Sequence, residues 1–414
     1  MLPPILEIYV VWHPDDHAGN AVSEVMVNHF QGSTFTGLVG AAVEVYVRSE
    51  GWSGRSDAPR PIPFPTGAAR PSGAAPQHLF TAVVPVVGNE LAHAVERGTG
   101  PWHDYLSEIA TAHATRPDQV AVFPVATDSS AARGTVLGRL LEPFHGIGRG
   151  RALIDEQLAD TWCRDLAQGV TQHFGRGQFG GDRLTVFISH TSKVDATGRG
   201  GDEGIVDRVR EIVTSSRLGR FFSTNDLQPG RNWSDELARH AASSALLAVR
   251  TSTYASRPWC QLEMLAAKQA GMPIVVLDAL EHPEERGSFL MDHVPRVPVR
   301  RDGDHWRDKD ILAGLNLLVD ECLKRTLWQR QGELEAAPAT WWAPHAPEPV
   351  TLVAWLEEQQ REGRLPADGP IRIVHPDPPV SAVELGELKR ILRVAGLSNA
   401  LEVVTPRQLA AGAS

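Results

Sequence analysis

Short apolar runs alternate with longer amphipathic segments between residues 184 and 328. The apolar runs predict buried β-strands because they are short and bounded by polar or turn-forming residues. They cover residues 184–189, 220–223, 245–250 and 273–277. Apolar residues at helical spacing predict helices at residues 203–218, 233–242, 258–270 and 309–328. Strands that alternate with helices in this way predict a parallel sheet with helices on both faces.

The first third of the chain repeats this plan. Strands are predicted at residues 6–12, 42–47, 80–87 and 120–125, and an amphipathic stretch at 153–170 matches the last helix of the later segment. Pro101-Trp102 precedes a helix here, as Pro258-Trp259 does in the later segment. We interpret the two segments as copies of one α/β domain that arose by duplication.

The predicted organisation has three α/β parts joined by two linkers. They are a first α/β domain at residues 1–147, a helix and Gly-rich linker at 148–180, a second α/β domain at 181–330, a Pro/Ala-rich linker at 331–349 and a small C-terminal domain at 350–414. The C-terminal part alternates helices at 350–361 and 382–395 with strands at 371–374 and 401–404, which is the size of one βαβ unit. We expect it to dock on the rest, because so small a unit buries little apolar surface by itself.

Composition and charge narrow the classes of function. The 414 residues carry a formal net charge of −10, which argues against binding nucleic acid through its phosphates. The three cysteines, Cys163, Cys260 and Cys322, lie far apart and match neither a disulfide framework nor a zinc site. No apolar run reaches the length of a membrane-spanning helix, and the first residues lack the pattern of a signal peptide. We therefore expect a cytoplasmic protein that binds neither membrane nor nucleic acid.

Three motifs stand at strand–helix junctions of the second domain. They are Phe187-Ile188-Ser189-His190, Asp226-Leu227-Gln228-Pro229-Gly230-Arg231-Asn232-Trp233 and Ser252-Thr253-Tyr254-Ala255-Ser256-Arg257-Pro258-Trp259-Cys260-Gln261-Leu262-Glu263. In this order and at these junctions, they make the domain resemble the Toll/interleukin-1 receptor (TIR) family, and its bacterial branch in particular. The resemblance implies a flavodoxin-like parallel sheet of strand order 2-1-3-4-5 with sites at the carboxyl ends of the strands. It makes the first domain a degenerate TIR-like copy.

The resemblance also implies a reaction. Many bacterial members of the family cleave the bond between nicotinamide and ribose in NAD, and their catalytic acid, the Glu of a Trp-Cys-x-x-Glu motif, falls on Glu263 here. The residues expected to bind the substrate are Phe187, Ser189, His190, Thr191, Trp233 and Trp259. NAD is then the substrate, and we expect neither a cofactor nor a metal.

The residues around Glu263 support this role on physical grounds. Trp259 lies four positions before Glu263, so the two side chains share one face of a helix. Ser256 can cap that helix and Pro258 is tolerated in its first turn. Nicotinamide in NAD is already cationic and can leave without a general acid. One carboxylate near the ribose can therefore stabilise the oxocarbenium transition state, whereas ordinary glycosidases need two carboxyl groups.

The second motif resembles the BB loop of the family, which in relatives mediates assembly and helps to close a neighbouring site. The residues expected to serve assembly are Asn225, Asp226, Pro229, Gly230 and Arg231. The Pro-Gly pair predicts a sharp turn. The resemblance implies an effector of bacterial anti-phage defence that is activated when TIR domains self-associate. An activating ligand or partner protein is left open, and so is the product, ADP-ribose or a cyclised form.

The alternative is a non-enzymatic TIR adaptor that acts through contacts between TIR domains. Glu263 is then an ordinary helix-surface residue and Trp259 a packing residue. A buried Glu263, or one that points away from any crevice, would favour this alternative. In the first domain, Leu106 stands four positions after Trp102 and Glu108 comes two positions late, so we expect that copy to be non-catalytic.

One more motif, His13-Pro14-Asp15-Asp16, resembles a zinc-binding motif of sugar deacetylases. No convincing downstream pair of histidines accompanies it, and His375-Pro376-Asp377 follows a later predicted strand in the same way. A Pro-Asp turn that ends a strand explains both occurrences, so no metal site is expected.

Overall fold

A computed structural model of the chain describes most of its residues. They are residues 4–35, 42–54, 58–65, 79–128, 130–144, 146–147, 156–179, 183–191, 203–216, 218, 221–222, 238–284, 286–334, 340–366 and 369–412. Contacts group the chain into two compact units, Met1–Phe174 and Gly175–Ser414. The boundary falls inside the segment expected to be a helix and linker. The finer domain boundaries expected from the sequence stay predictions.

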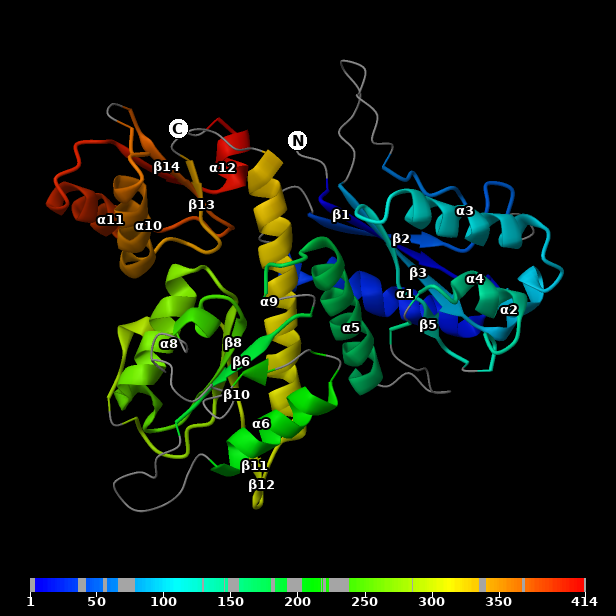
Figure 1. The fold of residues 1–414 in the computed structure, drawn as a ribbon, viewed down its shortest axis with the longest axis horizontal. Coiled ribbons are helices and arrows are strands. Elements are labelled where there is room, and N and C mark those ends of the chain that lie inside the picture. Colours follow the sequence, from blue (N-terminus) through cyan, green and yellow to red (C-terminus); the bar gives the residue numbers. More distant parts are fainter. Residues whose placement is uncertain are drawn as a thin grey trace. The chain divides into compact units, whose positions relative to one another are not determined.

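The first unit is built on a parallel sheet with strand order β2-β1-β3-β4, and β5 also pairs with β3 (Figure 1). Its strands are β1 (Leu6–Val11), β2 (Val43–Arg48), β3 (Phe80–Val87), β4 (Val120–Val122) and β5 (Val125–Ala126). Its helices are α1 (His17–Phe30), α2 (Asn89–Val95), α3 (Pro101–Thr115), α4 (Val136–Leu141) and α5 (Glu156–Phe174). All six residues of β1 are buried, as expected of a central strand that helices cover on both faces.

One prediction for this sheet is wrong in detail. The strand expected at residues 120–125 is two short strands, β4 and β5, separated by Phe123 and Pro124. Proline has no backbone N–H to give to a neighbouring strand, which accounts for the break.

The second unit contains the sheet expected from the middle of the sequence. Its strands are β6 (Val186–Ser189), β7 (Phe221–Phe222), β8 (Ala245–Arg250), β9 (Ile274–Asp278) and β10 (Arg296–Pro298). They pair in the order β10-β9-β8-β6-β7, and each neighbouring pair is parallel. Numbered along this domain, the order is 2-1-3-4-5, so the predicted flavodoxin-like fold is confirmed.

Helices cover both faces of this sheet. α8 (Pro258–Gln269) lies on one face, while the long α9 (Asp308–Leu334) crosses the other beside α6 (Glu203–Ser215) (Figure 1). Side chains alternate between the two faces along each strand. Phe187, Leu246 and Val276 accordingly pack against α8 in one apolar core. Ser189 follows Phe187 by two positions, so it points to the α8 face as well.

The C-terminal part of this unit has its own three-stranded parallel sheet, in the order β13-β14-β15. The strands are β13 (Thr340–Trp342), β14 (Ile371–Val374) and β15 (Leu401–Val404), and the helices are α10 (Pro349–Arg361), α11 (Ala382–Val394) and α12 (Pro406–Ala410). The segment expected to be a Pro/Ala-rich linker, residues 331–349, therefore holds a strand and the end of α9. Apolar residues of α10, α11 and the sheet share one small core, and α10 also packs on α8.

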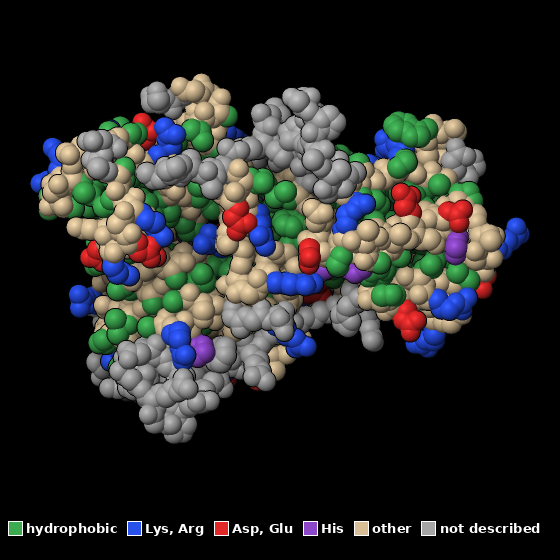
Figure 2. Space-filling model, turned by 45° about the horizontal axis from the view of Figure 1, so that its top comes forward, with side chains coloured by type: hydrophobic (Ala, Val, Ile, Leu, Met, Phe, Trp, Pro, Cys, Tyr) green, Lys and Arg blue, Asp and Glu red, His purple; other side chains and the backbone are tan. Residues whose placement is uncertain are grey.

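Two properties of the described residues bear on partners. No helix among them is long and apolar enough to cross a membrane. On the face that Figure 2 shows, basic and acidic side chains of the described residues are interspersed rather than gathered into a field of one sign.

Candidate functional site

Polar side chains end three neighbouring strands of the second sheet. Ser189 is the last residue of β6, Arg250 of β8 and Asp278 of β9. Because the strands are parallel, these residues lie along one edge, where sites of such sheets form. α8 begins eight residues after the end of β8, following a short 3₁₀ turn at Tyr254–Ser256, and carries Glu263.

Three side chains at this edge are joined in series by two hydrogen bonds. The Ser189 hydroxyl donates to Glu263 Oε2 at 2.5 Å, and the Tyr254 hydroxyl lies 2.6 Å from Ser189 Oγ. Since a serine has one hydroxyl hydrogen and Ser189 gives it to the carboxylate, Tyr254 donates to Ser189. The order of donation runs from Tyr254 through Ser189 to Glu263, so the hydrogen bonds favour a negative charge on the carboxylate.

Burial opposes that charge. Glu263 is only 3% exposed. Burial raises the pKa of its carboxyl group to about 7, while the hydrogen bond from Ser189 acts to lower that pKa. Burial, with Cys260 and Glu263 nearby, raises the pKa of the Tyr254 phenol well above its usual value, so the phenol stays a donor. Glu263 therefore exchanges its proton near neutral pH, as a group suited to catalysis does.

The burial of Glu263 contradicts one expectation. The expected role, contact with a ribose, needs an accessible carboxylate, whereas the structure leaves Glu263 3% exposed and hydrogen-bonded to Ser189. Trp259 is half-buried and packs against the core beneath α8, which is the packing role considered for it. In the single chain, then, the carboxylate is enclosed.

The start of α8 agrees with the sequence in the position of its proline. Pro258 occupies its first turn as expected, but the residue before it, Arg257, makes no side-chain cap. The Ser256 hydroxyl donates to the carbonyl of Thr253 inside the 3₁₀ turn. The Gln261 side chain donates to the carbonyl of Ala255 at 2.6 Å and ties the turn to the helix.

The other expected substrate-binding residues of the first motif lie around this chain of hydrogen bonds. Phe187 is 1% exposed and belongs to the core, and Thr191 is fully buried. His190 is half-buried, and its Nε2 lies 3.1 Å from the guanidinium of Arg210. Because Arg210 can only donate, Nε2 accepts. Burial and the charge of Arg210 lower the pKa of His190, so its ring is neutral and is not a cation for a phosphate.

Six predicted residues lie outside the described part of the chain. They are Trp233, expected to bind substrate, and Asn225, Asp226, Pro229, Gly230 and Arg231, expected to serve assembly. Their roles stay predictions.

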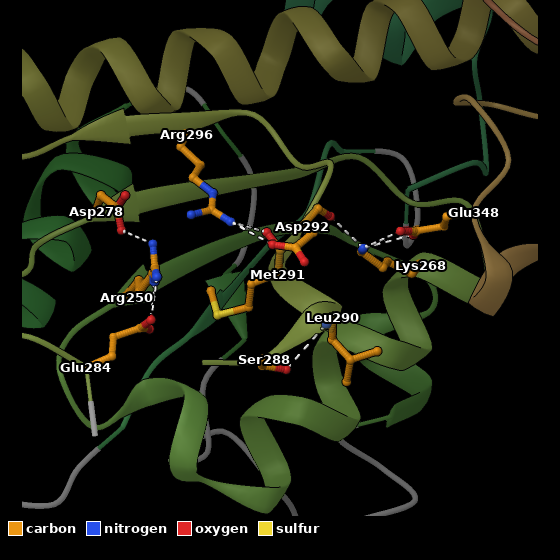
Figure 3. A network of polar contacts seen from close by, with 10 residues as sticks. All are labelled: Arg250, Lys268, Asp278, Glu284, Ser288, Leu290, Met291, Asp292, Arg296 and Glu348. Carbon is orange, nitrogen blue, oxygen red and sulfur yellow. Dashed lines mark hydrogen bonds and ion pairs between the residues drawn. The ribbon is translucent and has the colours of Figure 1, made fainter. Parts of the chain in front are cut away.

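Sequence reasoning missed an ionic cluster at the same sheet edge. Arg250 donates from Nε to Glu284 at 2.7 Å and from Nη1 to Asp278 at 2.9 Å (Figure 3). The hydrogen bond to Glu284 is the main cause that raises the pKa of Arg250. Because it binds two carboxylates, the charge of Arg250 is neutralised. Its bond to Asp278 also links the ends of β8 and β9. The signal in the sequence was a charged residue directly after the apolar run 245–249.

The corresponding positions of the first unit are apolar. Val11 ends β1, and Leu106 of α3 stands four residues after Trp102. All three belong to one buried core. Glu108 is exposed. These positions provide no carboxylate for chemistry at this edge.

The motif His13-Pro14-Asp15-Asp16 has a structural explanation. The Asp16 carboxylate accepts hydrogen bonds from the backbone N–H groups of Glu90 and Leu91, both at 3.1 Å. It thus satisfies free donors in the first turn of α2. Among the residues that the structure describes, no group of three or more His, Cys, Asp or Glu side chains is placed to hold a metal ion.

Comparison with known proteins identifies the second sheet. The family model described as TIR domain matches residues 186–311, which run from β6 into the start of α9. A search of curated proteins and a search of solved structures each gave no significant match.

Proposed function

This chain contains a TIR domain at residues 186–311, and from that premise we propose that it is an NAD nucleosidase that cleaves the nicotinamide–ribose bond with Glu263. The observation that carries the proposal is the pairing of Glu263 with Ser189 at the carboxyl end of β6, an interior strand of the sheet. In a TIR domain of this strand order, that edge is where a ligand is expected. The products are nicotinamide and ADP-ribose or a cyclised form of it.

The proposed chemistry needs one negative charge in the right place. As the cationic nicotinamide departs, positive charge grows on the ribose, and the Glu263 carboxylate stabilises it. A pKa of about 7 leaves a substantial share of the groups ionised at neutral pH. Ser189, with Tyr254 behind it, holds the carboxylate in place by the donor chain described above. No second carboxyl group is required, because the leaving group needs no proton.

The enclosure of Glu263 sets a condition on this activity. A carboxylate at 3% exposure cannot reach a ribose until the edge above it opens. We propose that self-association of TIR domains opens and completes the site, so that the single chain is inactive. This fits a cytoplasmic effector of bacterial anti-phage defence that destroys NAD only when assembled.

The same enclosure favours a second function. A non-enzymatic TIR adaptor needs no accessible carboxylate, and a buried Glu263 then serves only the packing of α8. The two functions differ in one measurable respect, the release of nicotinamide.

The test uses the purified full chain with NAD and measures nicotinamide. The chain is assayed alone and as a fusion to a protein that assembles into oligomers. We expect the assembled chain to release nicotinamide and Glu263→Gln to lower that rate about a hundredfold or more. Glutamine keeps the size of the side chain and an oxygen for Ser189 but carries no charge. Glu108→Gln in the first unit, an exposed glutamate, is the matched control and leaves the rate unchanged.

Two outcomes reject the enzymatic function. The first is an assembled chain that releases no nicotinamide while its TIR domains associate, which leaves the adaptor. The second is equal release by the wild type and Glu263→Gln.

A further inference from the structure

A pocket of about 130 Å³ lies beyond the end of α8, against the C-terminal sheet. α8 and the turn after it form one wall, β13 and the residues that follow it form another, and α9 contributes Arg325. Neither Ser189 nor Glu263 lines it, so it is a separate site within the second unit. Its lining combines cationic and aromatic side chains, which is the usual composition of a site for a small ligand.

Two cationic side chains face this pocket, and their circumstances differ. Lys268 is neutralised, because its Nζ lies 2.8 Å from Glu348 Oε1 and donates to the carbonyl of Asp292 (Figure 3). Arg325 donates from Nε to the carbonyl of Gly271 at 3.0 Å. Among the described residues, no carboxylate is paired with Arg325, and burial lowers its pKa. The two outer nitrogens of this guanidinium are therefore charged donors that can bind an anion.

Arg325 is reached from two sides. It also lines a second hollow, together with Arg176, Met272 and Gln329.

The aromatic wall supplies flat apolar surface. Trp341 stacks on Trp355, with ring centroids 5.3 Å apart, and Trp342 packs against Trp328 at 5.1 Å.

The backbone around the pocket is fixed in conformations that side chains rarely adopt. Gly271 has φ +63°, and a Cβ there would lie 2.8 Å from the ring of Pro344. His293, a non-glycine residue, has φ +58°. The left-handed Gly271 is the usual residue after a helix end, and its close approach to Pro344 leaves no room for a Cβ at this side of the pocket.

We propose that this pocket binds a small anion carried on one flat ring, with its carboxylate or phosphate on Arg325 and its ring against the tryptophan wall. The guanidinium supplies two parallel N–H donors that match either acid group. The indole faces supply contact area for the ring. A single ring with one acid group is the size that a cavity of about 130 Å³ admits.

Isothermal titration calorimetry of the full chain with four probes separates the contributions. Benzoate and phenyl phosphate carry both a ring and an acid group. Benzamide has the ring without the charge, and inorganic phosphate has the charge without the ring. We expect one or both of the first two to bind, and benzamide and phosphate to bind about tenfold more weakly or not at all, because each lacks one of the two interactions.

Variants assign the binding to Arg325. We expect Arg325→Gln to weaken the preferred probe about tenfold or more and Arg325→Lys to weaken it less, because lysine keeps the charge but not the paired donors. Arg393→Gln, at an exposed arginine of α11, is the matched control and leaves binding unchanged. Circular dichroism is used to check that each variant is folded. If Arg325→Gln proves unfolded, the comparison of Arg325→Lys with the wild type, and of charged with neutral probes, still decides the question.

Three results overturn the proposal. They are no binding of benzoate or phenyl phosphate at millimolar concentration, equal binding of benzamide, and binding that Arg325→Gln leaves intact. None of these measurements uses NAD, so they stand apart from the proposed activity. One consequence does rest on that activity. Residues 268–271 of the pocket end the helix that carries Glu263, so we expect the bound probe to change the rate of nicotinamide release.

Discussion

The first unit and the TIR domain place opposite chemistry at matching positions of similar sheets. In the TIR domain, the first strand, β6, ends in Ser189, which donates a hydrogen bond to Glu263 on the helix between the third and fourth strands. In the first unit, the first strand, β1, ends in Val11, and Leu106 stands at the matching position of α3 in the same apolar core. Both edges are buried and both sheets form. A polar pair at this edge is therefore not needed for the fold.

Burying a carboxyl group has a cost that the apolar pair avoids. The pKa of Glu263 rises from 4.5 to about 7 through burial, despite the hydrogen bond from Ser189. Such a shift corresponds to roughly 3 kcal/mol of destabilisation of the ionised form in the folded state. Titratable groups whose pKa is shifted strongly by burial are typical of functional sites. The comparison favours function at the TIR edge and a structural role at the other.

The largest change in stability is expected when a carboxyl group is introduced at the matching position of the first unit. Leu106→Glu places a carboxyl group in an apolar core where Val11 offers no hydrogen bond. We expect a loss of about 3 kcal/mol or more in the free energy of unfolding of this unit, measured by urea denaturation. Leu106→Met, which conserves volume, is the control and costs about 1 kcal/mol. A stable Leu106→Glu chain would show that this edge already tolerates an acid, and the contrast between the units would fail.

The next effect is a dependence of stability on pH. Because the folded-state pKa of Glu263 is raised, the folded chain holds this proton between pH 4.5 and about 7 while the unfolded chain releases it. This contribution to stability is therefore complete below pH 4.5, falls as pH rises through this window and is constant above it. Glu263→Gln removes the ionisation, so we expect it to unfold at higher urea than the wild type near pH 8, by roughly 3 kcal/mol.

That gain should shrink toward pH 5, where the wild-type carboxyl is protonated as well. Glu108→Gln, at an exposed position of the first unit, is the control and should show the same small difference at both pH values. A Glu263→Gln chain that is less stable than the wild type near pH 8 would mean that the carboxylate is a favourable partner in the fold, contrary to the comparison.

The contrast between the edges also shows what sequence reasoning can reach. Apolar runs such as 245–250 are self-contained signals, and that strand matches its prediction residue for residue. Ser189 and Glu263 were both singled out by the motifs they belong to. Their hydrogen bond spans 74 residues, however, and its burial depends on packing that no local pattern encodes. Helical spacing placed Trp259 and Glu263 on one face but could not say whether that face turns inward.

Other differences have local causes that the sequence contained. Pro124 divides the strand expected at 120–125, and proline within an apolar run is a recognised signal for this. The strand Thr340–Trp342 is only three residues long and lies in a stretch rich in Ala and Pro. The composition of that stretch therefore predicted a linker. It became visible only through its pairing with β14, 32 residues farther along by register from Trp342 to Val374.

A smaller effect is expected when Ser189 loses its hydroxyl. Its hydrogen bond acts to lower the pKa of Glu263, so Ser189→Ala should raise that pKa further. In the assembled chain, the rate of nicotinamide release should rise with pH as the carboxylate ionises, with a midpoint at or below about 7 in the wild type, because opening the edge relieves the burial that raises this pKa. In Ser189→Ala we expect this midpoint to move up by about one pH unit. A midpoint that moves down, or a profile without pH dependence, would separate the rate from Glu263.

The smallest effect is expected from Tyr254→Phe, which sharpens the comparison because phenylalanine makes this position as apolar as the first unit. The phenol donates to Ser189 and not to the carboxylate, so its removal leaves the Ser189–Glu263 bond intact. We expect a loss of about 1 kcal/mol in the free energy of unfolding and a fall in rate of less than about tenfold. The pH midpoint should move less than in Ser189→Ala, because the phenol reaches the charge only through the serine. A larger effect than that of Ser189→Ala would mean that Tyr254 meets the carboxylate or the substrate directly, and the order of donation from Tyr254 through Ser189 to Glu263 would be wrong.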